Sequence, residues 1–292
     1  MNRAPVYKPL FQKIRFPLGS GFFADIQILR EDLNHPLLQG NKFWKLRHNV
    51  LYAQEQGIQN LLSFGGAYSN HIHALAAAGE LYGLNTIGII RGEEPESYSS
   101  TLQFARERGM QLHFISREAY RNKHTENFLQ DLKEQFGSFH LIPEGGSNAL
   151  GFKGCLEWGT HLQGTADLFC LAAGTGATAA GIAKANPTAL VWAFSALKNG
   201  GFLKEEAEKI AGSPLPNLHI ITDYHLGGYA KYNSELLHFI HEIESEYQIP
   251  LEQVYTGKAL HGLLDLFKKG KINPGLKVCF IHTGGLQGKL SQ

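Results

Sequence analysis

The sequence is poor in several features that define protein classes. Its 292 residues contain only three cysteines, Cys155, Cys170 and Cys279, which are too few and too widely spaced for a disulfide framework or a zinc site. We expect them to be buried free thiols. The formal net charge is only +1, so no broad basic field exists to attract nucleic acid or anionic lipid. We therefore expect no nucleic-acid partner and no metal centre.

Long apolar runs are also missing. No segment has the uninterrupted apolar length of a membrane span, and residues 1–14 lack an apolar stretch after their basic residues. These absences predict a cytoplasmic protein with no membrane partner. The hydrophobic fraction of 43% and the charged fraction of 18% are those of a globular protein. A chain of this length can form one large domain or two modest ones.

What the chain does have is a regular alternation of apolar, strand-like runs with segments of helical periodicity. Crossover helices between strands form right-handed βαβ units and parallel sheets, so we expect an α/β fold. The strand count favours two lobes with a ligand cleft between them. One long polar helix is expected over 116–136. The expected strands lie at 60–64, 85–92, 111–116, 140–146, 168–174, 190–196, 217–224 and 277–282.

The segment from Gly174 to Gly181 (GTGATAAG) follows an apolar strand and opens a helix. Glycines allow the backbone to approach an anion, and a helix N-terminus supplies free N–H groups and a favourable dipole. The segment is not a Walker A loop, and it lacks the glycine spacing of dinucleotide-binding folds. It predicts a phosphate cradle. The alternative is a tight turn that binds no ligand.

Lys42 lies in Gly40-Asn41-Lys42, followed by Phe43 and a tryptophan. A lysine at such a helix start can be desolvated enough to lower its pKa and to serve as a Schiff-base amine. An isolated lysine is more often a surface residue, and Lys45 is the local rival for the role.

A third loop runs from Ser63 to His71 (SFGGAYSNH) and again joins a strand to a helix through glycines. Its hydroxyl, amide and backbone groups can donate hydrogen bonds to a substrate carboxylate. Ser69 or Asn70 can instead serve only to cap the helix that begins near His71. The two roles can coexist.

Five motifs occur together and in order: GNK at 40–42 with KL at 45–46, SxGGxxSN at 63–70, PEGGS at 143–147, VYTGK at 254–258 and HTGG at 282–285. In this combination the chain resembles the D-cysteine desulfhydrase and 1-aminocyclopropane-1-carboxylate (ACC) deaminase family. These are enzymes of the tryptophan-synthase-β-like fold, fold type II, that use pyridoxal 5′-phosphate (PLP). The resemblance runs from about Arg30 to Gly285.

The resemblance implies two lobes, each a mostly parallel, open, twisted sheet flanked by helices, with PLP in the cleft. The larger, PLP-binding domain would comprise 1–47 and 157–292, and the smaller domain, with the carboxylate loop, would comprise 48–156. Lys42 would bind the cofactor covalently, Asn70 its ring hydroxyl, and Thr256 would face its pyridine nitrogen. The phosphate would be held by Gly174, Thr175, Gly176, Ala177 and Thr178.

For the substrate, the resemblance implies binding by Ser69, Asn70, His71, Thr283 and Gly284. Its catalytic residues would be Lys42, Ser69, Tyr229 and Tyr255. The substrate would be a small amino acid. A homodimer is also expected from the family.

Two positions bear on the reaction. ACC deaminases carry Glu where Thr256 stands and Leu where Thr283 stands, whereas the desulfhydrases have threonine at both. A neutral hydroxyl does not hold a proton on the pyridine nitrogen as a carboxylate does, so the electron sink is weaker. This favours α,β-elimination of D-cysteine.

Other interpretations stay open at this point. The chain departs from the family at Gln253, where a proline is usual, and at His71, where the deaminases have glutamine. Alternatives are an ACC deaminase, elimination from another β-substituted amino acid, a binding protein that keeps the fold without turnover, and a sugar or nucleotide kinase. A kinase should have an aspartate near its phosphate loop, and 174–181 contains none.

Overall fold

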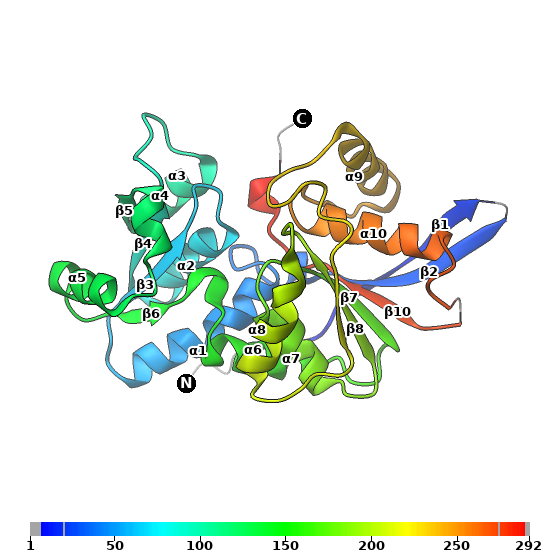
Figure 1. The fold of residues 1–292 in the computed structure, drawn as a ribbon, viewed down its shortest axis with the longest axis horizontal. Coiled ribbons are helices and arrows are strands. Elements are labelled where there is room, and N and C mark those ends of the chain that lie inside the picture. Colours follow the sequence, from blue (N-terminus) through cyan, green and yellow to red (C-terminus); the bar gives the residue numbers. More distant parts are fainter. Residues whose placement is uncertain (1–6, 20, 274, 290–292) are drawn as a thin grey trace.

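The structure is a computed structural model that describes residues 7–19, 21–273 and 275–289. It contains two sheets side by side, each flanked by helices (Figure 1). The larger sheet has the strand order β1-β2-β10-β7-β8-β9, and the smaller has the order β5-β4-β3-β6. The expected α/β class with two mostly parallel sheets is therefore confirmed.

The larger sheet comprises β1 (Phe11–Gly19), β2 (Phe22–Leu29), β7 (Leu168–Ala173), β8 (Leu190–Ser195), β9 (Leu218–Ile221) and β10 (Val278–Ile281). The smaller comprises β3 (Asn60–Gly65), β4 (Asn85–Arg91), β5 (Gln111–Ile115) and β6 (His140–Ile142). All these pairings are parallel except that of β1 with β2. This hairpin was not foreseen from the sequence. Its short connection, with positive φ at Gly19 and Gly21, allows only antiparallel pairing.

The helices are α1 (Asn41–Glu55), α2 (Asn70–Tyr82), α3 (Ser100–Glu107), α4 (Arg117–Arg121), α5 (Glu126–Phe136), α6 (Ala149–Thr160), α7 (Ala177–Ala185), α8 (Leu203–Ala211), α9 (Ser234–Tyr247) and α10 (Thr256–Lys268). Short 3-10 turns are η1 (Glu31–Leu33), η2 (Glu144–Gly146), η3 (Gly200–Phe202) and η4 (Leu286–Gly288). Figure 1 shows α6, α7 and α8 on one face of the larger sheet, and α9 and α10 on the other.

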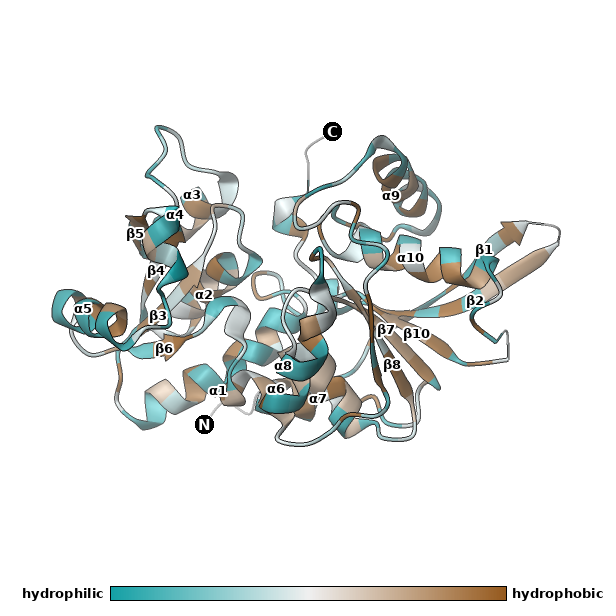
Figure 2. Cartoon of the chain, viewed as in Figure 1, coloured by the Kyte–Doolittle hydropathy of each residue, from teal (hydrophilic) through white to brown (hydrophobic). Residues whose placement is uncertain are grey.

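Burial on both faces explains the apolar strands. Every residue of β7 is buried. Leu168 and Cys170 pack with α9 and α10, whereas Phe169 and Leu171 pack with α6, α7 and α8. In the smaller sheet, α2 and α3 cover one face, and α4 and α5 cover the other. Figure 2 accordingly shows hydrophobic strands between helices that turn their polar sides outward.

The single long helix expected up to Phe136 is wrong, because the segment forms α4 and α5 with a break between them. A new helix begins where the Thr125 hydroxyl accepts a hydrogen bond from the backbone N–H of Phe128 at 3.4 Å. Such a cap satisfies one of the N–H groups that a helix start leaves unpaired. The cap therefore allows a second helix to start within one polar segment.

Helices α1 and α6 join the two sheets. Trp44 of α1 packs with Cys155 and Trp158 of α6 in the core of the larger sheet, whereas Val50 and Ala53 pack in the core of the smaller one. The expected domain boundaries, at 47/48 and 156/157, fall inside these two helices. We propose that α1 and α6 form the joint between the domains, with α6 belonging to the larger.

The cysteine prediction is confirmed, since Cys155, Cys170 and Cys279 are buried and free. Within the described ranges, no helix combines the length and the apolar character that crossing a membrane requires.

Candidate functional site

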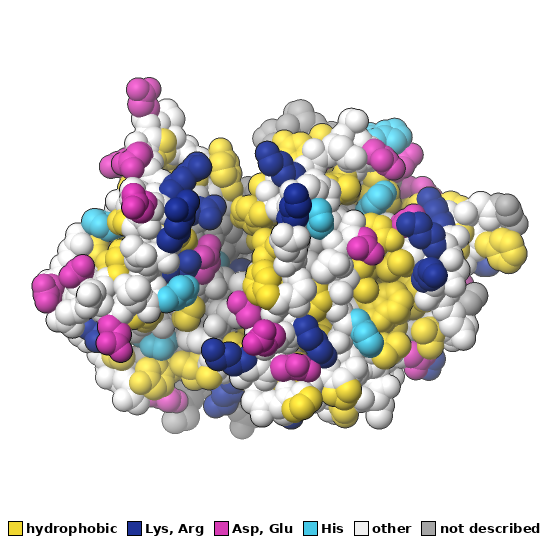
Figure 3. Space-filling view, in the orientation of Figure 1, with side chains coloured by type: hydrophobic (Ala, Val, Ile, Leu, Met, Phe, Trp, Pro, Cys, Tyr) yellow, Lys and Arg dark blue, Asp and Glu magenta, His cyan; other side chains and the backbone are white. Residues whose placement is uncertain are grey.

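A cavity of about 870 Å³ lies between the two sheets and is lined by residues of both. Figure 3 shows the hollow between the lobes on the outer surface. A second cavity of about 230 Å³ adjoins it and shares Asn41, Lys42, Asn70 and Thr283. The larger cavity brings together most of the residues singled out in the sequence: Lys42, Ser69, Asn70, His71, Gly174, Thr175, Thr178, Tyr229, Tyr255, Thr283 and Gly284. Gly176, Ala177 and Thr256 line neither cavity.

Lys42 is the second residue of α1 and lines both cavities. Burial, and then the positive charge of Lys45, lower the pKa of its amine to about 7. Its Nζ donates to Asn41 Oδ1 at 3.0 Å. The preceding Gly40 has φ +66°, and a Cβ there would lie 1.8 Å from the carbonyl oxygen of Thr283. Only glycine lets this loop pack so closely, so Gly40 determines where Lys42 emerges.

Lys45 is 1% exposed and lies on the same helix, α1, three residues after Lys42. Its Nζ donates to the carbonyl oxygen of Gly145 at 3.0 Å and to Thr175 Oγ1 at 2.9 Å. Burial lowers the pKa of its amine from the usual value. Since these contacts hold Lys45 at the phosphate loop, Lys42 is the better candidate for the reactive amine. The contacts of Lys45 support the sequence-based preference for Lys42 as the reactive amine, which stays a prediction.

The predicted phosphate loop joins β7 to α7. Thr178 Oγ1 accepts from Asn41 Nδ2 at 2.9 Å, which ties the loop to the start of α1. A Cβ at Gly174 would lie 2.8 Å from Tyr255 Cε1, and one at Gly176 would lie 2.8 Å from the backbone nitrogen of Ala207 in α8. The glycines therefore serve close packing. The loop also presents the N-terminus of α7, whose first N–H groups have no partner within the helix.

The predicted substrate loop joins β3 to α2. Ser69 caps α2, because its Oγ accepts from the backbone N–H of Ile72 at 3.3 Å; it also lines the cavity. His71 is 2% exposed, and its Nε2 lies 2.9 Å from Ser63 Oγ. Its Nδ1 is buried without a hydrogen-bond partner. Burial, and then the charges of Lys42 and Lys45, lower the pKa of His71 well below its usual value, so the ring is neutral.

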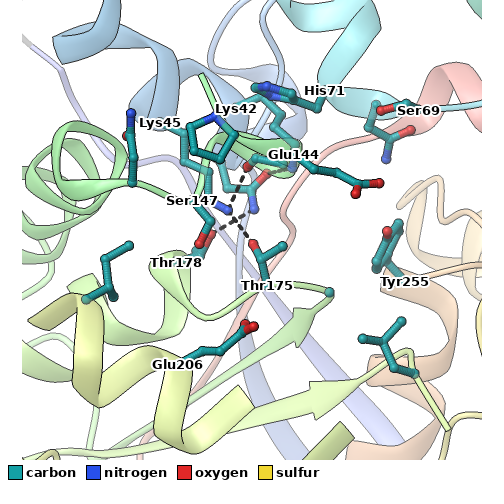
Figure 4. Close-up of a pocket in the computed structure, with 18 of the residues that line it drawn as sticks. Lys42, Lys45, Ser69, His71, Glu144, Ser147, Thr175, Thr178, Glu206 and Tyr255 are labelled. Atoms are coloured by element: carbon teal, nitrogen blue, oxygen red, sulfur yellow. Dashed lines mark hydrogen bonds between the residues drawn. The ribbon is translucent and has the colours of Figure 1, made fainter. Parts of the chain in front are cut away.

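Tyr229 and Tyr255 form a pair with ring centroids 6.0 Å apart. Burial raises the pKa of both hydroxyls, and for Tyr255 the nearby Tyr229 and Glu252 add to the effect. Both hydroxyls are therefore protonated near neutrality and can donate hydrogen bonds. In Figure 4, Tyr255 lies across the cavity from Thr175 and Thr178.

Thr256 is fully buried. Its Oγ1 donates to Glu252 Oε1 at 3.2 Å and accepts from the backbone N–H of Glu252 at 3.1 Å. The Glu252 carboxylate also accepts from the backbone N–H groups of Val254, Tyr255 and Thr256, each at 2.7 Å. Glu252 thereby holds the start of α10. The expected contact of Thr256 with a pyridine nitrogen stays a prediction, and this placement does not support it.

Charged groups lie on both sides of the cavity. Arg91, Lys123 and Glu144 line it from the side of the smaller sheet, and Glu206 and Lys209 line it from α8. Lys123 Nζ lies 3.5 Å from Glu144 Oε2. Nowhere in the described residues do three or more His, Cys, Asp or Glu side chains gather so that they could hold a metal ion.

These residues fit PLP. Lys42 supplies an amine of lowered pKa, and Thr175, Thr178 and Lys45 stand at a helix N-terminus where a phosphate is stabilised. The cavity therefore offers an amine for covalent attachment, a binding site for the phosphate anion, and polar groups for the rest of the cofactor.

The sequence did not identify every residue of the site. Asn41 and Glu144 lie inside quoted motifs but were not singled out, although proximity to Lys42 was a signal for Asn41. Glu252 lies just before the VYTGK motif. An acidic residue ahead of a helix start was the sequence signal that could have identified it. Gln287 lines the second cavity and had no signal in the sequence.

Comparison with known proteins places the chain. Residues 17–284 match the family described as "Pyridoxal-phosphate dependent enzyme". A putative ACC deaminase of Pyrococcus horikoshii is 30% identical over 91% of this chain and 86% of its own length. The mitochondrial bifunctional D-cysteine desulfhydrase/ACC deaminase of Arabidopsis thaliana is 31% identical over 91% of this chain and 73% of its own length.

Among solved structures, that of an ACC deaminase homologue aligns with a TM-score of 0.76 at 28% identity, covering 91% of this chain and 86% of the other. The fold-type-II resemblance seen in the sequence is thereby confirmed. Together with the cavity and its lysine, these findings establish that the chain belongs to the family of pyridoxal-phosphate-dependent enzymes.

Proposed function

We propose that this protein is a PLP-dependent lyase that converts D-cysteine to pyruvate, ammonia and hydrogen sulfide. The observation that carries the proposal is the position of Lys42. Its amine has a pKa of about 7 and lies in one cavity with a phosphate cradle and a donor-rich loop. The cofactor, once bound, supplies an electron sink for the charge left when the α-proton departs.

Residues at different positions in the cavity have different roles in the proposed reaction. Ser69, Asn70 and the neutral His71 bind the substrate carboxylate, with the free Nδ1 of His71 as one contact. The Lys42 amine is unprotonated in a substantial fraction of molecules near neutrality, so it can accept the α-proton. Tyr255 holds its own proton and can donate to the departing sulfur.

A specific observation favours D-cysteine over ACC. Thr283 lines both cavities beside Lys42, at a position where the resembling deaminases have leucine. A hydroxyl suits a polar, sulfur-bearing substrate better than a cyclopropane. ACC deamination remains the second candidate, because similar proteins carry that name and one is named for both activities.

The test is a visible absorption spectrum of the purified protein loaded with PLP, followed by D-cysteine in one cuvette and ACC in another. Pyruvate and sulfide released from D-cysteine support the proposal. Release of 2-oxobutanoate from ACC alone replaces it with the deaminase. A spectral response to both amino acids without any product would identify a binding protein.

We also propose a cytoplasmic homodimer. Three buried free thiols suit a reducing compartment. The β1–β2 hairpin carries the exposed side chains of Phe22 (71%) and Phe23 (46%), which a second copy could cover. Light scattering coupled to gel filtration tests the dimer, and a monomer at working concentration would contradict it.

A further inference from the structure

The C-terminal turn η4 reaches from the larger domain to the substrate loop. It follows β10 and contacts α3 of the smaller domain, and in Figure 1 it is the red segment that faces the smaller lobe. Gly285, just before it, has φ +88°, and a Cβ there would lie 2.2 Å from Asn70 Nδ2. Glycine is required for the turn to come this close to Asn70.

Because the turn lies close to Asn70, the side chain of Gln287 can reach the Asn70 amide. Its Nε2 donates a hydrogen bond to Asn70 Oδ1. An asparagine amide has one accepting oxygen and one donating NH₂ group. Since Gln287 engages the oxygen, the Asn70 amide is held in one of its two orientations, and its NH₂ group is left for other partners. Asn70 lines both cavities beside Lys42.

The turn is itself anchored. Gln253 Nε2, ahead of α10, donates to the carbonyl oxygen of Gly288 at 2.9 Å. A proline, which the resembling family has here, offers no such donor. Two glutamines thus connect the larger domain to Asn70 through the turn. The contact spans 217 residues of sequence between Asn70 and Gln287.

We propose that Gln287 is a positioning residue, which orients the Asn70 amide so that its NH₂ group donates to the ring hydroxyl of bound PLP. A donor to that oxygen stabilises its anionic form and so lowers the pH at which the bound cofactor loses its proton. Gln287 therefore lowers the pH midpoint of this proton loss, and it does so through Asn70. The inference requires the part of the proposed function that concerns PLP binding, and it does not require that D-cysteine is the substrate.

The test is a pH titration of the visible band of the PLP-loaded protein in the absence of substrate. Gln287→Met keeps the side-chain length and removes the donor. Loss of the oriented hydrogen bond should raise the midpoint by about half a unit to one unit, the equivalent of one ordinary hydrogen bond. Gln130→Met is the matched control, because Gln130 is exposed on α5 and bonded only locally, to Glu134 at 3.1 Å.

A double-mutant cycle separates positioning from a general effect. Asn70→Ala should raise the midpoint by at least as much, and Gln287→Met should then add nothing. An unchanged midpoint in folded Gln287→Met, checked by circular dichroism, overturns the inference, as does a full additive shift in the Asn70→Ala background. If the variants titrate as expected but the protein does not convert D-cysteine, only the proposed substrate is contradicted, and the positioning role of Gln287 stands.

Discussion

The phosphate-loop side and the substrate-loop side of the cavity differ in how far their polar groups are already satisfied. On the first side, Lys45 bonds to Thr175 and Gly145, and Asn41 bonds to Thr178. On the second, the buried Nδ1 of His71 has no partner. The cofactor side is thus organised before any ligand binds, whereas the substrate side keeps capacity for one. Changes on the two sides should therefore act on different quantities.

The largest effect is expected from removing the reactive amine. Lys42→Ala should abolish the visible band of bound PLP and lower turnover by about a thousandfold or more, because covalent attachment is lost. Absorption spectra and product release measure the two effects. Lys45→Ala, a change of the same size on the same helix, is the control, and it should keep the visible band. Unaltered turnover in Lys42→Ala would refute the assignment.

Gly40→Ala should destabilise the whole site. The new Cβ would collide with the Thr283 carbonyl at 1.8 Å, and φ is +66°. We expect the free energy of unfolding to fall by about 2 to 4 kcal/mol, as measured by urea denaturation. Gly57→Ala is a matched control, because Gly57 also has φ +66° but nothing lies near its Cβ. If both variants lose the same free energy of unfolding, the contact between the new Cβ and the Thr283 carbonyl is not the cause.

Lys45→Met should weaken PLP binding without abolishing attachment. It removes a charged donor to the phosphate loop, for which we expect about a 10- to 100-fold rise in the PLP dissociation constant. It should also raise the pKa of Lys42, since the charge of Lys45 lowers that pKa. Equilibrium dialysis measures the affinity. An increase in KM at unchanged PLP affinity would place Lys45 on the substrate side instead.

The rate of cofactor attachment should rise with pH. Only the unprotonated amine reacts, and a pKa of about 7 for Lys42 makes the reactive fraction climb from about a tenth at pH 6 to about nine tenths at pH 8. Stopped-flow absorbance with apoprotein and PLP gives the profile. An ordinary lysine would show a rate still rising near pH 10, and such a profile would contradict the buried environment.

The smallest effect is expected on the substrate side. His71→Gln places an amide where the neutral ring stands, so its hydrogen bond to the substrate carboxylate is weakened and not lost. We expect KM to rise about two- to threefold, less than the roughly fivefold rise that loss of one whole neutral hydrogen bond would give, at constant PLP affinity. Steady-state kinetics and dialysis make the comparison. A change in PLP affinity instead of KM would erase the distinction between the two sides.

Short-range features of this protein were predictable from sequence. The glycine loop before α7 and the Ser69 cap of α2 depend on neighbours a few residues away, so their pattern carries the signal. The break between α4 and α5 was missed, although Thr125 is a local cap. Polarity on both sides of the break concealed it, because a solvated helix and a solvated turn have similar compositions.

The sequence by itself determined the α/β class, the buried thiols and the short loops that carry Lys42 and Ser69. Only the tertiary structure decided which lysine faces the phosphate loop, since Lys45 meets Gly145 and Thr175 across 100 and 130 residues. It alone brought Gln287 to Asn70, across 217 residues of sequence. The physical reason is range. Periodicity and capping act within one element, whereas a site between two sheets depends on how whole sheets and helices pack.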